Sequence, residues 1–88
     1  MKTAFRKSFA RDLKKIKNQE VRGRVLQAIE QVEAASDLHS VTDLKKLRGT
    51  EGFFRIRIGD FRIGLVLDGE TIEFVRCLPR RDLYRYFP

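Results

Sequence analysis

Apolar residues recur at helical spacing through the first part of the chain. Residues 8–18 predict an amphipathic helix with Ser8 as its N-cap, and residues 19–35 predict a second helix. The repeating apolar positions are Phe9, Leu13 and Ile16 in the first segment and Val21, Val25, Ala28, Ile29 and Val32 in the second. We therefore expect a helical hairpin, preceded at residues 3–6 by a segment that could form a brief edge strand.

The period of the pattern changes from helical to two in the second half of the chain. Apolar residues alternate with arginine and other residues over 54–58 and again over 61–67, and Gly59 and Asp60 lie between these segments. This is the pattern of a β-hairpin with a tight turn. Residues 71–78 are apolar on both faces and predict a central strand.

Residues 36–42 are polar and predict a loop, after which Leu44 and Leu47 are expected to anchor the chain before a turn. The predicted order is a strand, two helices and three antiparallel strands. That order is typical of an α+β fold, in which a short N-terminal strand and a helical hairpin pack on one face of a twisted, mainly antiparallel sheet. Because no linker or repeat interrupts the sequence, residues 1–88 are expected to form one domain.

The charge of the chain points to an anionic partner. Its 88 residues carry a formal net charge of +7, from 19 Lys and Arg against 12 Asp and Glu. The apolar fraction of 42% excludes a disordered tail, and no apolar run reaches the length of a spanning helix. All 7 cations after residue 48 are arginine, which suits bidentate phosphate contacts; a bias toward arginine codons is the alternative explanation.

Alternation along the hairpin gathers arginines on one surface. If the apolar residues face the helices, then Arg55, Arg57 and Arg62 project from the opposite face, where Asp60 at the turn is the only acid of these two strands. Like charges side by side repel, and an RNA or DNA phosphate would resolve the repulsion. The alternative is a solvated face that is screened by water and counterions.

A second basic cluster closes the sequence. Asp82 is expected to cap a short helical turn that presents Tyr84 and Arg85, a pairing that suits nucleic acid through base stacking and phosphate contact. Tyr86 and Phe87 are instead expected to pack the end of the chain against the sheet.

Three stretches of sequence, 44–49, 54–63 and 80–85, resemble in their order and spacing the RelE branch of the RelE/ParE toxin superfamily. Residues 9–16 are similar to the first helix of that family. The resemblance implies a RelE-like fold and the toxin of a type II toxin-antitoxin pair. Such a toxin is a ribosome-dependent endoribonuclease that cleaves mRNA in the ribosomal A site by attack of the ribose 2′-hydroxyl, and its partner is a small acidic antitoxin.

The resemblance also implies roles for individual residues. Arg62 matches an arginine that contacts the scissile phosphate, Arg80 matches a second phosphate-binding arginine, and Tyr84 matches a tyrosine that stacks on the substrate base. Arg55 and Arg57 match two basic residues that are lysines in the best-known branch. Because arginine stays protonated, it cannot act as an ordinary general base, so either Tyr84 or an unidentified group takes the proton, or the site acts by orientation and charge stabilisation.

Other basic residues are candidates for binding RNA or the ribosome under the same resemblance. They are Lys45, Lys46, Arg48, Arg81 and Arg85. For the three residues near Leu47 the alternative is a solvated basic turn.

Neither a metal nor a cofactor is expected. The single His39 and the single Cys77 cannot build a metal site together, and we expect His39 on the surface and Cys77 buried in a strand. The first residues are charged without an apolar segment behind them, so no secretory signal is expected and a cytoplasmic location is predicted.

Two other functions stay open at this point. A ParE-like inhibitor of gyrase would share the fold without cleaving RNA, and a nucleic-acid-binding module would dock phosphates without reaction. The arginines that accompany Tyr84 favour the nuclease, because a toxin that binds a protein has no chemical need for a converging phosphate site.

Overall fold

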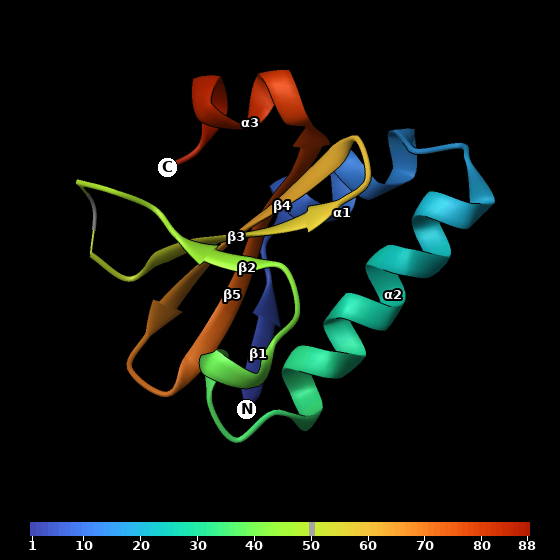
Figure 1. The fold of residues 1–88 in the computed structure, drawn as a ribbon. Helices are drawn as coiled ribbons and strands as arrows, with labels where there is room; N and C mark the ends of the chain where they lie inside the picture. Colours follow the sequence, from blue (N-terminus) through green and yellow to red (C-terminus); the bar gives the residue numbers. More distant parts are fainter. Residues whose placement is uncertain (50) are drawn as a thin grey trace.

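Five strands form one sheet in the order β1-β5-β4-β3-β2, with β1 parallel to β5 and every other pair antiparallel (Figure 1). The computed structural model describes residues 1–49 and 51–88. The strands are β1 (Lys2–Phe5), β2 (Leu44–Lys46), β3 (Phe53–Ile58), β4 (Phe61–Asp68) and β5 (Thr71–Pro79), and the helices are α1 (Lys7–Lys15), α2 (Gln19–Ala34), the 3-10 helix η1 (Leu38–Ser40) and α3 (Arg80–Tyr86). None of the described helices is long and apolar enough to cross a membrane.

The helical hairpin packs on one face of the sheet, as the sequence predicts, and Figure 1 shows α2 running alongside the strands. The Asn18 side chain caps α2 by accepting hydrogen bonds from the N–H groups of Glu20, at 2.9 Å, and Val21, at 3.2 Å. The core between the hairpin and the sheet contains Phe9, Ile16, Val25, Ile29, Val32, Ile56, Ile58, Ile63, Leu65, Ile72, Phe74 and Cys77. The predicted apolar faces of both helices and of the β-hairpin therefore meet.

The start and end of α1 differ from the prediction. Arg6 occupies the N-cap position, so the assignment of Ser8 as N-cap is wrong. The Ser8 hydroxyl instead donates a hydrogen bond to the Val75 carbonyl of β5 at 2.6 Å. The helix ends at Lys15, earlier than predicted, and the side chain of Arg22 donates to the Leu13 carbonyl at 2.6 Å. The Ser8 hydroxyl is thus used for a bond to β5, and an Arg22 side chain satisfies a carbonyl near the C-terminal end of α1.

A short edge strand stands where the sequence predicts only anchors before a turn. Residues Leu44–Lys46 pair with β3, with Leu44 opposite Ile56, Lys45 opposite Arg55 and Lys46 opposite Phe54. Three residues are too few to show a period of two, so pairing with β3 defines this strand. The strand also fixes the faces on which its two lysines lie.

The C-terminal helix α3 packs on the face of the sheet opposite the hairpin, which the prediction of helices on one face does not include. Figure 1 shows α3 at the top of the view, directly after the end of β5. A second cluster of buried residues, Leu47, Leu83 and Phe87, lies there against Phe53 and Val75. Val75 reaches this face through a β-bulge, because Leu65 pairs with Phe74 while Gly64 pairs with Arg76.

Gly64 allows the chain end to approach the sheet. A Cβ atom on Gly64 would lie 2.7 Å from the Phe87 ring, closer than side chains tolerate. Phe87 is buried as predicted. Tyr86 is 55% exposed and packs only partly against the sheet, with its ring centroid 5.6 Å from the guanidinium carbon of Arg76 in β5. Pro79 holds the N-cap position of α3 and no side chain caps the helix, so the prediction of Asp82 as its cap is also wrong.

Candidate active site

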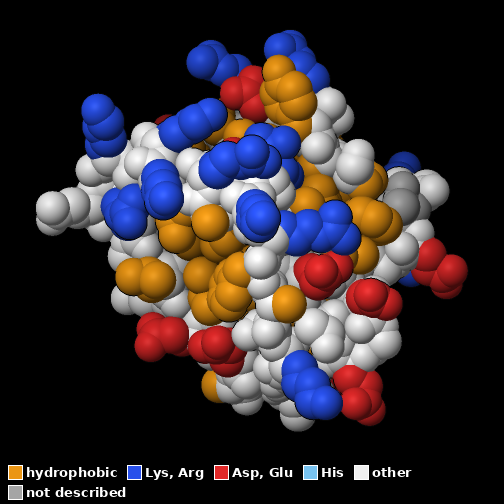
Figure 2. Space-filling view, turned by 180° about the vertical axis from the view of Figure 1, so that it is seen from behind, with side chains coloured by type: hydrophobic (Ala, Val, Ile, Leu, Met, Phe, Trp, Pro, Cys, Tyr) orange, Lys and Arg blue, Asp and Glu red, His pale blue; other side chains and the backbone are white. Residues whose placement is uncertain are grey.

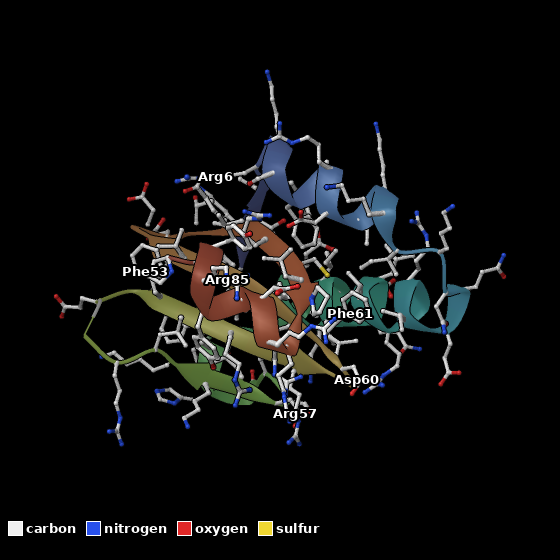
Figure 3. The ribbon with its side chains drawn as sticks, turned by 90° about the horizontal axis from the view of Figure 1, so that it is seen from above. Arg6, Phe53, Arg57, Asp60, Phe61 and Arg85 are labelled. Atoms are coloured by element: carbon white, nitrogen blue, oxygen red, sulfur yellow. The ribbon has the colours of Figure 1, made fainter. Side chains whose placement is uncertain are left out.

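The β-hairpin places three arginines on the face opposite α1 and α2. Arg57 lies directly across from Arg62, and Arg55 lies across from Gly64. Their strand neighbours Ile56, Ile58 and Ile63 belong to the core on the other face. The predicted alternation is therefore confirmed, and Figure 3 shows Arg57 at the end of the hairpin close to Asp60 and Phe61.

Arg62 is the central residue of this cluster. It is only 8% exposed, and its guanidinium donates to the main-chain carbonyls of Gly59, at 2.7 Å, and Phe61, at 2.9 Å. Burial lowers the pKa of the Arg62 guanidinium, and repulsion by Arg55, Arg80 and Arg57 lowers it further, whereas Tyr84 raises it. Together with Arg62, these four residues make up the five that the resemblance assigns to the reaction. The charges of the other four all act on Arg62.

The junction of β5 and α3 brings Arg80 to the hairpin. The Arg80 N–H donates to the Asp60 carbonyl at 2.7 Å, which ties the start of α3 to the β3–β4 turn. A shallow groove of about 410 Å³ lies here, lined by Asp60, Pro79, Arg80 and Arg81. The exposed Arg80 is thereby held beside a groove that is open to an incoming phosphate.

Tyr84 lies on α3 and is 60% exposed. Leu83, its neighbour in the chain, is fully buried and anchors the helix to the sheet. The ring of Tyr84 is thus presented to solvent from a fixed helix, as base stacking requires.

Asp43, which the sequence does not single out, holds two of the arginines. Its main-chain carbonyl accepts a hydrogen bond from the Arg55 guanidinium at 2.7 Å, and its carboxylate pairs with Arg57 at 3.2 Å. Asp43 also has a φ of 61°, in the left-handed region. Asp is among the few non-glycine residues that adopt this region, and that tolerance is the one weak signal in the sequence.

The additional basic candidates divide between the two faces. Lys45 pairs with Arg55 and shares its face, whereas Lys46 pairs with Phe54 on the helix side, where it lines a cavity with Met1 and Leu38. The structure therefore does not bring Lys46 to the arginine cluster.

Three further basic candidates lie on the surface. Arg48 is exposed near the turn after β2, and Arg81 and Arg85 are exposed on α3. Basic side chains also gather over the upper part of the rear face, seen in Figure 2, where the described acids lie mostly in the lower half. This distribution extends the positive surface beyond the arginine cluster.

His39 and Cys77 lie apart from the arginines. His39 belongs to η1, and Cys77 is buried in the core on the helix side. Burial raises the pKa of the Cys77 thiol to about 12, so this side chain is an unreactive packing residue at neutral pH.

The geometry suits a phosphodiester. Arg62 and Arg80 offer fixed positive charge, Arg55 and Arg57 extend it along β3, and Tyr84 offers a ring beside it. An array of this kind has the chemistry to bind an anionic strand and to stabilise negative charge that develops in a transition state.

Comparison with known proteins decides the family. The sequence model of the family described as "ParE toxin of type II toxin-antitoxin system, parDE" matches residues 4–84. The chain belongs to this toxin family. Within it, the chain is of the RelE-like branch, since it is 39% identical to the Toxin RelE3 of Methanocaldococcus jannaschii over an alignment of 89 positions that covers both chains in full.

Solved structures agree with this assignment. The fold of this ParE-family toxin matches a chain in the crystal structure of the RelB-RelE antitoxin-toxin complex from Methanococcus jannaschii with a TM-score of 0.82 and 38% identity, covering 97% of this chain and 99% of that one. A chain of the archaeal RelE-RelB complex from Pyrococcus horikoshii shares the fold with a TM-score of 0.72 at 22% identity, covering 90% and 93%. The protein is thus a toxin of a type II toxin-antitoxin system.

Proposed function

We propose that this toxin is a ribosome-dependent endoribonuclease that cleaves mRNA in the ribosomal A site and so inhibits translation. The observation that carries the proposal is Arg62, a buried arginine that is surrounded by Arg55, Arg57 and Arg80. Three arginines around a buried fourth repel it and so do not stabilise the fold. The same four positive charges would stabilise the negative charge of a phosphorane-like transition state.

The proposed reaction uses the substrate's own nucleophile. The ribose 2′-oxygen attacks the adjacent phosphorus, the bond from phosphorus to the 5′-oxygen breaks, and the products are a 2′,3′-cyclic phosphate and a free 5′-hydroxyl. Arg62 and Arg80 would neutralise the charge that grows on the non-bridging oxygens, and Tyr84 would hold the base by stacking. Neither a cofactor nor a metal-bound water takes part in these steps.

The fate of the 2′-hydroxyl proton distinguishes this site from one with lysines. Arg55 and Arg57 stay protonated and cannot accept it. The proton would pass to water, either directly or through the Tyr84 phenol, which would give up its own proton as it accepts one, and the leaving 5′-oxygen would take a proton from water. The arginines would orient the ribose and the phosphate.

We infer a cognate antitoxin as the second partner. The RelE chains of the similar solved structures come from RelB-RelE complexes. A small acidic protein encoded beside this toxin would complement its net charge of +7. Because the target is the translating ribosome, the site of action is the cytoplasm.

Primer extension on transcripts from a translating extract tests the proposal. Adding the purified toxin should produce cuts in phase with codons, and omitting ribosomes should abolish them. Intact transcripts in the complete extract would overturn the proposed nuclease.

Membership of the ParE toxin family favours ParE-type action as the second candidate. A supercoiling assay with purified gyrase in parallel separates the two functions. Inhibition of gyrase together with intact transcripts would identify that alternative.

A further inference from the structure

Asp43 contacts both arginines of β3 from a loop that is remote in sequence from that strand. Its carbonyl accepts hydrogen bonds from the Arg55 guanidinium at 2.7 Å and from the Arg57 main-chain N–H at 3.2 Å, and its carboxylate pairs with the Arg57 guanidinium at 3.2 Å. These contacts use both the main chain and the side chain of one residue. We propose that Asp43 is a positioning residue for RNA cleavage, which sets the placement of Arg55 and the effective charge of Arg57; this inference rests on the proposed function.

The backbone conformation of Asp43 contributes to this role. A φ of 61° is uncommon for a residue other than glycine, and such conformations persist where the surrounding structure requires them. Here the conformation precedes the edge strand β2 and directs the carbonyl toward Arg55. That carbonyl is the acceptor to which the half-buried side chain of Arg55 donates.

The carboxylate of Asp43 acts on charge rather than on stability. The side chains of Asp43 and Arg57 are 39% and 57% exposed, and an ion pair at such a position contributes little to folding. Arg57 lies across from Arg62, so an unpaired Arg57 guanidinium would add to the repulsion at the buried arginine. Pairing with Asp43 offsets part of the Arg57 charge and holds Arg57 in place beside Arg62.

This role predicts opposite effects on binding and on cleavage. Asp43→Asn keeps the backbone conformation but removes the ion pair with Arg57. The freed Arg57 guanidinium should add one phosphate contact to RNA binding. Because Arg57 is then no longer held in place, the ribose and the phosphate that it orients should be less well aligned. We expect the dependence of log Kd on log salt to steepen by about 0.7 for a single strand. The cleavage rate should fall by about tenfold to a hundredfold, as small misplacements of reacting groups do.

The experiment compares Asp43→Asn, Asp43→Gly and Asp43→Ala with the wild-type toxin. Asp68→Asn is the matched control, because it makes the same change of charge at an exposed residue at the far end of β4. Binding is measured by fluorescence anisotropy on a short 2′-O-methyl oligoribonucleotide, which cannot be cleaved, over a series of salt concentrations. Cleavage is measured by primer extension in a translating extract, and thermal melts establish that each variant is folded.

The glycine and alanine variants separate the two contributions of Asp43. Both lack the carboxylate, but glycine adopts the left-handed region freely and alanine does not. Asp43→Gly should therefore match Asp43→Asn, while Asp43→Ala should cleave more slowly than either because the carbonyl that holds Arg55 moves.

Two results would overturn the proposal. One is a salt dependence of Asp43→Asn equal to that of Asp68→Asn, and the other is cleavage by all three Asp43 variants at the wild-type rate. A wild-type toxin that binds the oligoribonucleotide but leaves transcripts intact would instead overturn the proposed function, and with it the role of Asp43 in cleavage.

Discussion

Two charged side chains are buried in the described part of the chain, Asp12 and Arg62, and their surroundings differ. Asp12, on α1, accepts hydrogen bonds from the Arg76 guanidinium at 2.7 and 3.1 Å and from the Cys77 N–H at 2.9 Å. The hydrogen bond with Asp12 raises the pKa of Arg76, so the charged form of Arg76 is stabilised. Arg62 bonds only to neutral carbonyls among the described groups and is repelled by other arginines.

The difference separates a structural charge from a functional one. The hydrogen-bonding capacity of Asp12 is met within the fold, and it joins α1 to β5. The positive charge of Arg62 is not neutralised within the described part of the chain, and a bound anion would neutralise it. A buried charge whose balance requires a ligand is a candidate for chemistry, and a buried charge that the fold balances is a candidate for stability.

Removing the side chain of Arg62 should have the largest effect on activity. We predict that Arg62→Ala slows transcript cleavage by about 10²–10³-fold, the usual cost of losing a preorganised charge donor. The free energy of unfolding should change by no more than about 1 kcal/mol, because relief of desolvation and repulsion offsets the lost hydrogen bonds. Primer extension and urea unfolding measure the two quantities, and wild-type cleavage by this variant would refute the site.

Removing the side chain of Asp12 should have the converse effect. Asp12→Ala leaves the guanidinium of Arg76 and the N–H of Cys77 without their acceptor, and we predict a loss of about 3 kcal/mol of stability. The double variant Asp12→Ala/Arg76→Ala should lose less than the two single losses together, because no charge is then left unpaired. Additive losses in urea unfolding would contradict this account of the pair.

Tyr84 tests how much of the site depends on base stacking. Because its ring is exposed, Tyr84→Ala should leave stability nearly unchanged and weaken RNA binding by about 1–3 kcal/mol. Tyr84→Phe retains the ring and should retain binding. Its cleavage rate then distinguishes the two routes of the proton, because a loss of cleavage without a loss of binding shows that the Tyr84 hydroxyl takes part in the transfer.

Gly64 tests the docking of α3 independently of the arginines. Gly64→Ala places a methyl group within 2.9 Å of three atoms of the Phe87 ring, and we predict a loss of about 1–3 kcal/mol together with reduced cleavage as Tyr84 shifts. Gly23→Ala is the control, because the corresponding Cβ in α2 meets open space. Thermal melts should show the control equal to or more stable than the wild type, whereas equal melts for both variants would mean that Phe87 does not restrict the site.

Ionisation of Cys77 should have the smallest effect of those predicted here, and it tests how well the core is buried. The folded thiol has its pKa raised to about 12, while the unfolded thiol ionises near 9, so stability is independent of this group below about pH 9 and falls as the pH rises toward 12. Cys77→Ala should remove this part of the decline. Alkylation of Cys77 at pH 8 should require unfolding, and rapid labelling of the folded toxin would show that the thiol is accessible.

The local patterns of the sequence predict much of this structure. The alternation of apolar residues with Arg55, Arg57 and Arg62 predicts their common face, and the register confirms it. The apolar stripe of residues 19–35 predicts α2 to within one residue. These inferences hold because side-chain direction follows from the period of a strand or helix, whatever the rest of the fold does.

The sequence patterns do not predict a hydrogen bond whose two partners come from distant segments of the chain. Ser8 has the side chain of an N-cap but bonds to Val75, and Asp12 lies on the apolar side of α1 because Arg76 and Cys77 receive it. An acid three residues after Phe9 on that stripe is the one sign of this role in the sequence.

What the sequence alone determined is the set of charged residues and the face on which the hairpin displays them. The tertiary structure decided what each charge meets. It placed Arg80 beside the hairpin turn through Asp60, brought Asp43 to Arg55 and Arg57, and turned Lys46 to the opposite face. The physical reason is that a charge acts through its distance to other charges and its exposure to water, and both depend on the packing of segments that are far apart in the chain.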